Sequence, residues 1–138
     1  MDLLDLKPKQ SQVTLHHPIT KEIILTNSNL PVILNVVGQD SIQMQKARLD
    51  WAKFVMDKKI DGKSPSVEEG FQMGIDTVCN CVTGWDENLN EFFKPLDDAG
   101  TGTYSPELVR KILSDPSFGF IREEIDTYMG NRENFFTK

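Results

Sequence analysis

The chain has 138 residues, of which 38% are hydrophobic and 26% are charged, a composition typical of one globular domain with a hydrophobic core. Its net charge of −6 and its scattered lysines and arginines argue against binding to a phosphate backbone or an anionic membrane surface. No segment approaches the roughly 18 consecutive apolar residues of a membrane span, and residues 1–10 lack the hydrophobic region of a signal peptide.

The N-terminal part of the chain has the pattern of short strands. Residues 1–11 are polar and follow no sustained period, so we expect a mobile arm there. Three runs rich in β-branched or aliphatic residues follow at 13–15, 23–25 and 31–37, with turn-forming residues between them. These runs predict an antiparallel β-meander over residues 12–38.

Helical periodicity begins after Gly38. Asp40 and Gln43 have the spacing of a capping box, and they predict the start of a helix that runs to about Lys59. Apolar residues at three- and four-residue intervals give this helix one apolar face, made of Met44, Ala47, Trp51, Phe54 and Val55.

A second helix is predicted from Ser66, because Glu69 completes another capping box. Gly70 and Gly74 lie one turn apart, and each glycine weakens a helix by about 1 kcal/mol relative to alanine. We therefore expect another helix to approach closely there. Gly84 is the expected end of this helix.

Two more helices are expected after a long acidic connection, residues 86–103, which we expect to hold a short helical turn. Ser105 followed by Pro106 is a start signal for the third helix, and Asp115-Pro116 repeats it for the last one, which Gly130 ends. The predicted fold class is α+β, with about three strands and then about four helices. We expect one domain over 12–138, with a helical bundle over 39–130 and a tail over 131–138.

The strongest candidate metal site is a broken calcium loop. Four residues match its ligand positions 1, 3, 5 and 12: Asp86, Asn88, Asn90 and Asp97. Glu91 stands where the sharp turn needs glycine, and Asp97 replaces the bidentate glutamate, so we expect no calcium binding.

Other candidate sites also lack a required partner. His16 and His17 would point to opposite faces of a strand, which prevents them from sharing a metal easily. Cys79 and Cys81 do not have the spacing of a redox or zinc motif, and we interpret them as reduced, buried residues. No nucleophile elbow occurs, so the sequence predicts no enzyme, metal or cofactor.

Four aromatic residues follow no helical stripe: Phe92, Phe93, Phe135 and Phe136. Exposed aromatic pairs often mark the contact surface for a partner protein, so these four are the predicted partner-binding residues. The alternative is that they fold back and cap the helical bundle.

Four blocks of the sequence, taken in order, give a family resemblance. They are Val-Val-Gly-Gln-Asp-Ser at 36–41, Val-Thr-Gly-Trp at 82–85, the segment 104–113 that begins Tyr-Ser-Pro-Glu-Leu, and Gly-Asn-Arg-Glu-Asn-Phe-Phe at 130–136. Over the range from about Val13 onward, the chain resembles the tail assembly chaperones of long-tailed bacteriophages.

The resemblance implies a binding function in the host cytoplasm. Such chaperones are thought to coat the long, largely helical tape-measure protein, to keep it soluble, and to give way as tail-tube subunits polymerise. The resemblance therefore implies the tape-measure and tail-tube proteins as partners, is compatible with a homo-oligomer, and implies absence from the mature virion. Two alternatives remain: a structural virion component of the tail tip, tail completion or neck, and an enzyme or metal-dependent binder.

Overall fold

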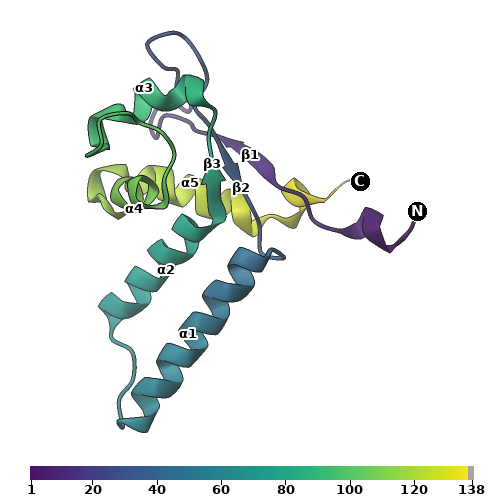
Figure 1. Cartoon of the computed structure of the whole chain (residues 1–138), viewed down its shortest axis with the longest axis vertical. Coiled ribbons are helices and arrows are strands. Elements are labelled where there is room, and N and C mark those ends of the chain that lie inside the picture. The colour runs from purple at the N-terminus through teal and green to yellow at the C-terminus, as the bar shows by residue number, and fades with distance from the viewer. Residues whose placement is uncertain (137–138) are drawn as a thin grey trace.

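The computed structural model, which describes residues 1–136, has a three-stranded antiparallel sheet and five α-helices in that range (Figure 1). The strands are β1 (Ser11–Thr14), β2 (Ile33–Val36) and β3 (Val82–Gly84). The helices are α1 (Ile42–Ile60), α2 (Val67–Cys81), α3 (Asn90–Phe93), α4 (Pro106–Ser114) and α5 (Gly119–Gly130). The predicted α+β fold class is confirmed, and the last two residues of the predicted tail, 137–138, lie outside the described residues.

The sheet has the order β1-β2-β3, in which β1 and β2 correspond to the first and third predicted strands, and β3 was not predicted as a strand. Residues 23–25 do not form a strand and contribute only two isolated bridges, His16 with Ile23 and Leu25 with Pro31. The third strand instead follows α2 directly, and Val82 pairs with Val36 of β2. The predicted helix end at Gly84 is therefore wrong, because the helix stops at Cys81 and the chain enters the sheet.

In the segment between β1 and β2, backbone N–H and C=O groups form hydrogen bonds without the regular ladder of a β-sheet. Leu15 N donates to Val32 O at 2.9 Å, Ile24 N donates to Leu15 O at 2.9 Å, and Val32 N donates to Ile24 O at 3.0 Å. Lys21 and Asn29 take left-handed backbone conformations, with φ of 64° and 62°, and each reverses the chain. This closed triangle of hydrogen bonds explains why an aliphatic run that suits a strand does not become one.

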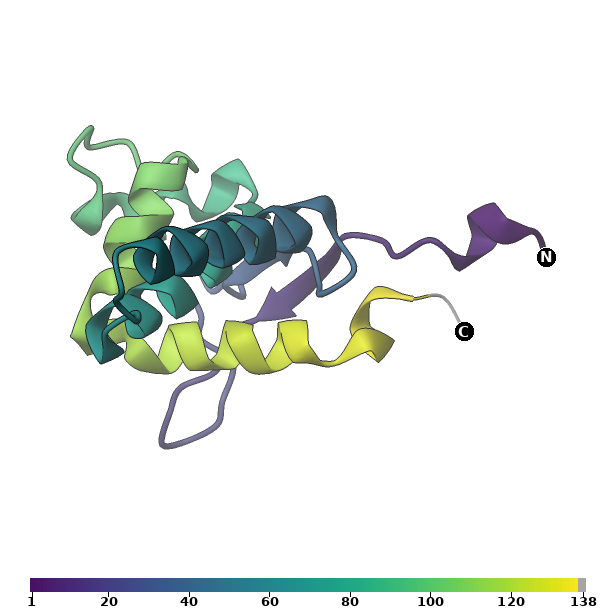
Figure 2. The same ribbon diagram turned by 90° about the horizontal axis from the view of Figure 1, so that it is seen from below.

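One face of the sheet forms the core with three helices. The buried strand residues are Val13, Leu34, Val36 and Val82, which all face the same side. Helices α2, α4 and α5 supply the rest, including Ile75, Val78, Cys79, Cys81, Leu108, Val109, Ile112, Leu113, Ile121, Ile125 and Met129. Residues 1–10, by contrast, are exposed and extend away from this core (Figure 2).

Most helix termini follow the predicted signals, but the end of α2 and the start of α1 do not. The capping box of Ser66 and Glu69 is present, Ser105 caps α4 ahead of Pro106, and α5 ends at Gly130. The cap of α1 is Ser41 rather than Asp40, since the Ser41 hydroxyl accepts a hydrogen bond from Met44 N. The Asp40 carboxylate has another partner, described below.

The long connection after β3 is anchored by Trp85. The predicted helical turn is present as α3, and Phe93 from this helix stacks on Trp85 with ring centroids 4.0 Å apart. Trp85 Nε1 donates to the carbonyl of Gly102 at 3.1 Å, which brings the acidic loop back against α3. Gly102 has a φ of +74°, and a Cβ there would clash with the backbone of Asn90.

We expect Gly102→Ala to lower the free energy of unfolding by about 2 kcal/mol or more, because it adds a backbone clash to the strain of a positive φ. Gly100→Ala is the matched control, since Gly100 has a φ of +76° and open space around its Cα. Its cost is the conformational strain alone, about 1 kcal/mol. Urea unfolding measures both, and equal costs would contradict the close approach at Gly102.

Candidate partner-binding surface

Helices α1 and α2 form a hairpin that projects away from the sheet (Figure 1). One face of α1 packs on α2, where Lys58 Nζ of α1 lies 2.9 Å from Glu69 Oε1 of α2. On this side of α1, the rings of Trp51 and Phe54 stack with centroids 5.5 Å apart. A groove of about 570 Å³ opens between the two helices. Ala47 is the only buried residue of α1, so α1 contributes little to the core.

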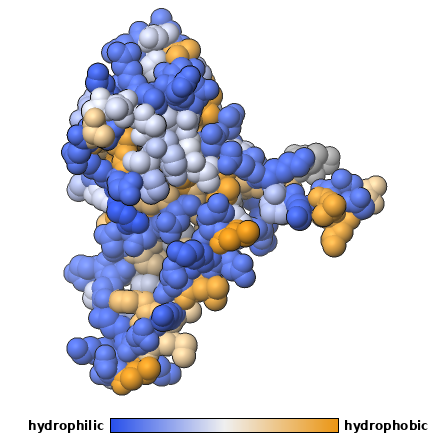
Figure 3. Space-filling model, viewed as in Figure 1, coloured by the Kyte–Doolittle hydropathy of each residue, from blue (hydrophilic) through white to orange (hydrophobic). Residues whose placement is uncertain are grey.

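The opposite face of α1 is also apolar. Four large side chains lie there with exposed fractions between 63% and 81%: Ile42, Leu49, Met56 and Ile60. The predicted apolar face is therefore the less exposed side of α1, and the helix has a second apolar face toward solvent that was not predicted from the sequence. Figure 3 shows hydrophobic surface along the outer edge of this helix. We call these four residues the outer stripe of α1.

Helix α2 has exposed apolar residues of its own near the tip of the hairpin. Val67 is 87% exposed and Phe71 is 59% exposed, with the Arg122 guanidinium 5.1 Å from the Phe71 ring centroid. Gly70 and Gly74 have open space where a Cβ would lie. The expected close approach of another helix at these glycines is therefore wrong within this single chain.

Helix α1 is basic, although the chain as a whole is acidic. Helix α1 has five basic residues, Lys46, Arg48, Lys53, Lys58 and Lys59, and two acidic ones, Asp50 and Asp57. Its net charge is therefore +3, whereas the net charge of the whole chain is −6. A basic and apolar outer surface favours an acidic partner that also presents apolar side chains.

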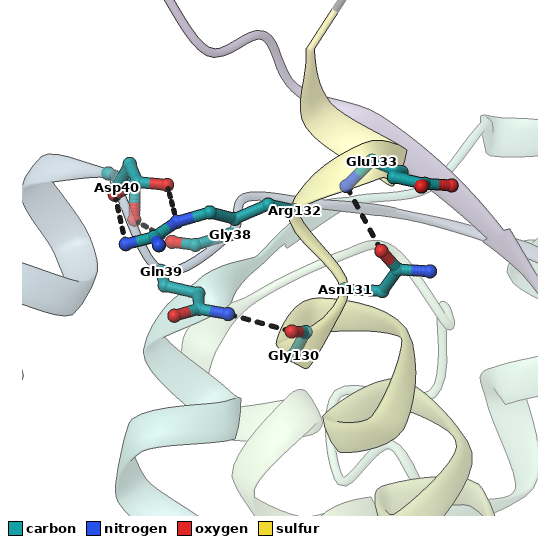
Figure 4. Close-up of polar contacts among 8 residues, drawn as sticks. Gly38, Gln39, Asp40, Gly130, Asn131, Arg132 and Glu133 are labelled. Carbon is teal, nitrogen blue, oxygen red and sulfur yellow. Dashed lines mark hydrogen bonds and ion pairs between the residues drawn. The ribbon is translucent and has the colours of Figure 1, made fainter.

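The start of α1 is attached to the C-terminal segment (Figure 4). Arg132 donates from Nε and Nη2 to the two carboxylate oxygens of Asp40, at 2.9 and 3.0 Å, and these hydrogen bonds hold the pKa of Asp40 below its usual value. Gln39 Nε2 donates to the carbonyl of Gly130 at 2.7 Å, and the Phe135 ring lies against Gly38. These contacts hold the segment that leads into α1 against the end of α5.

Two of the four predicted partner-binding aromatics lie in the core. Phe93 is 5% exposed and Phe135 is 4% exposed, so neither can contact a partner at the surface. Phe92 and Phe136 are half-buried and pack against the same core. Phe93 and Phe135 therefore follow the alternative prediction, in which the aromatic residues fold back over the helical bundle. The large exposed apolar side chains lie on α1 instead.

The histidines and calcium-loop residues serve local structure. His16 Nδ1 lies 2.7 Å from Glu124 Oε2, at one side of an open groove between β1 and α5, and His17 Nδ1 accepts from Ile19 N. Asp86 Oδ1 accepts from Asn88 N, and Asp97 accepts from three backbone N–H groups of its own loop. Within residues 1–136, no group of three or more His, Cys, Asp or Glu residues is arranged to hold a metal ion.

No family model, curated protein or solved structure matches this chain. The candidate surface therefore rests on the geometry of α1 and α2. None of the helices within residues 1–136 combines the length and apolar character needed to cross a membrane.

Cys79 and Cys81 are buried free thiols, as expected of small core residues. Burial raises the pKa of each thiol to about 11. At pH 8 only about one thiol in a thousand is then a thiolate, and the thiolate is the reactive form.

We expect a thiol reagent such as Ellman's reagent to leave the native chain nearly unmodified at pH 8 and to modify both cysteines rapidly in urea. The two traces are compared at equal reagent concentration. Rapid modification of the native chain would show that the end of α2 opens readily or is not part of the core.

Proposed function

We propose that the protein is a tail assembly chaperone of a long-tailed bacteriophage, which binds and solubilises the tape-measure protein and helps to recruit tail-tube subunits. It would act in the host cytoplasm and be absent from the mature virion. The observation that carries this proposal is the outer stripe of α1, a row of exposed apolar side chains on a helix that projects from the core. The four sequence blocks that resemble this family support it independently.

The shape of the surface suits a helical client. An amphipathic helix of the client would lie along α1 and bury apolar side chains that each protein alone exposes to water. Full burial of one Leu or Met side chain contributes roughly 1.5–3 kcal/mol, before the entropic cost of association is subtracted. One hairpin therefore gives a weak contact, whereas many copies along one client give a coat that tail-tube subunits can displace stepwise.

The chain exposes other large apolar residues away from the hairpin, and these provide a control. Ile19 is 82% exposed and Leu25 is 52% exposed in the segment between β1 and β2. Changing these two residues removes a similar amount of exposed apolar surface without touching α1.

We expect the variant Leu49→Ser/Met56→Ser to lose the ability to keep a co-expressed tape-measure protein soluble and to co-purify with it. The control Ile19→Ser/Leu25→Ser should retain both properties. Because all four side chains are more than half exposed, neither variant should lower the stability of the chain itself by more than about 0.5 kcal/mol. The readouts are the soluble fraction of the client and its recovery with the tagged chain.

Two outcomes would contradict the proposal. One is a native chain that neither solubilises nor binds the tape-measure protein. The other is a stoichiometric amount of this chain in purified virions by mass spectrometry, which would identify it as a structural tail component.

A further inference from the structure

The outer stripe of α1 has the spacing of a helix-pairing seam. Ile42, Leu49 and Met56 are separated by seven residues, and Ile60 follows one turn later on the same side. A seven-residue repeat keeps apolar side chains along one line of a helix, where a second helix can pack against them. The line lies opposite the face that holds Ala47 and Trp51 against α2, so a partner has access to it.

Basic residues flank this seam at a matching interval. Lys46 and Lys53 stand four residues after Ile42 and Leu49, which places them beside the apolar line where flanking charges contact a paired helix. Lys46 Nζ lies 3.6 Å from Asp50 Oδ2, but both side chains are more than 60% exposed, and such a pair holds its members weakly. Among residues 1–136, Lys53 has no carboxylate within ion-pair distance.

We propose that the α1 seam pairs with an amphipathic helix of a partner protein whose apolar stripe is flanked by Asp and Glu side chains. Opposite charges beside a helix pair choose the partner and its orientation more than they add affinity. In the tail assembly role this partner helix belongs to the client, and to that extent the inference rests on the proposed function.

A second copy of this chain fits the seam less well. Pairing two α1 helices would place Lys46 and Lys53 of each copy beside a helix of net charge +3, which is repulsive. The acidic helix α5 offers no apolar stripe to a second copy, because Ile121, Ile125 and Met129 are buried in its own core.

The test uses two designed peptides and the full chain. Both peptides have four heptads with Leu at the seam positions, and they differ only in Glu or Lys at the flanking positions. Fluorescence anisotropy at low salt measures the affinity of each labelled peptide. We expect the Glu peptide to bind on the order of tenfold more tightly than the Lys peptide, and we expect the difference to shrink as salt is added.

The charge reversal Lys46→Glu/Lys53→Glu should invert this preference. The matched control is Lys7→Glu/Lys9→Glu, which makes the same change in net charge on the exposed N-terminal arm and should leave the preference unchanged. Circular dichroism checks that each variant keeps the helical content of the native chain, so that a loss of binding is not a loss of folding.

Three outcomes would overturn the inference: equal binding of both peptides, a preference that Lys46→Glu/Lys53→Glu leaves intact, or a concentration-dependent dimer that Leu49→Ser abolishes. The peptide assay does not involve the tape-measure protein. If the peptide assay fails but the chain still solubilises the tape-measure protein, this inference is wrong and the proposed function stands. If the Glu peptide binds selectively but the tape-measure protein does not bind, the proposed function is wrong and this inference stands.

Discussion

The rest of the structure depends on the direct passage from α2 into β3. Val82 is the C-cap residue of α2 and also a buried member of the sheet, paired with Val36. This passage places the C-terminal half of α2 in the core and leaves its N-terminal half outside. Helix α1 packs mainly along α2, since one face of the sheet is already covered by α2, α4 and α5. The exposed outer stripe of α1 is a consequence of this arrangement.

An apolar stripe in water is unfavourable for an isolated domain, and large exposed apolar patches often mark contact sites. The hairpin is attached through α2 and through the contacts of Asp40 with Arg132 and of Gly38 with Phe135. With so few buried side chains of its own, α1 is expected to open locally at a lower free energy than α4 or α5. A partner that covers the stripe would stabilise α1 in proportion to the apolar surface that it buries.

Local signals predicted the helices well, and nonlocal pairing was the main source of error. Ser66 with Glu69, Ser105 with Pro106, and Gly130 act within one turn, so the sequence around each is sufficient. The strand at Val82–Gly84 forms by pairing with β2, which is far away in the chain. Residues 23–25 do not form a strand, because the chain turns at Lys21 and again at Asn29. The seven-residue interval of Ile42, Leu49 and Met56 is present in the sequence. It was not recognised, because the apolar residues that face α2 follow the more familiar three- and four-residue spacing of a core-facing helix. The burial of Phe93 and Phe135 depends on tertiary contacts that no local pattern contains.

We propose that a partner protein covers the outer stripe of α1. Hydrogen–deuterium exchange of the chain, alone and in complex with the tape-measure protein, measures this most directly. We expect slower exchange in the complex to be concentrated in residues 42–60 and at the start of α2, with little change in β1, β2 and α5. Protection confined to the sheet or to the segment after Gly130, with α1 unchanged, would contradict it.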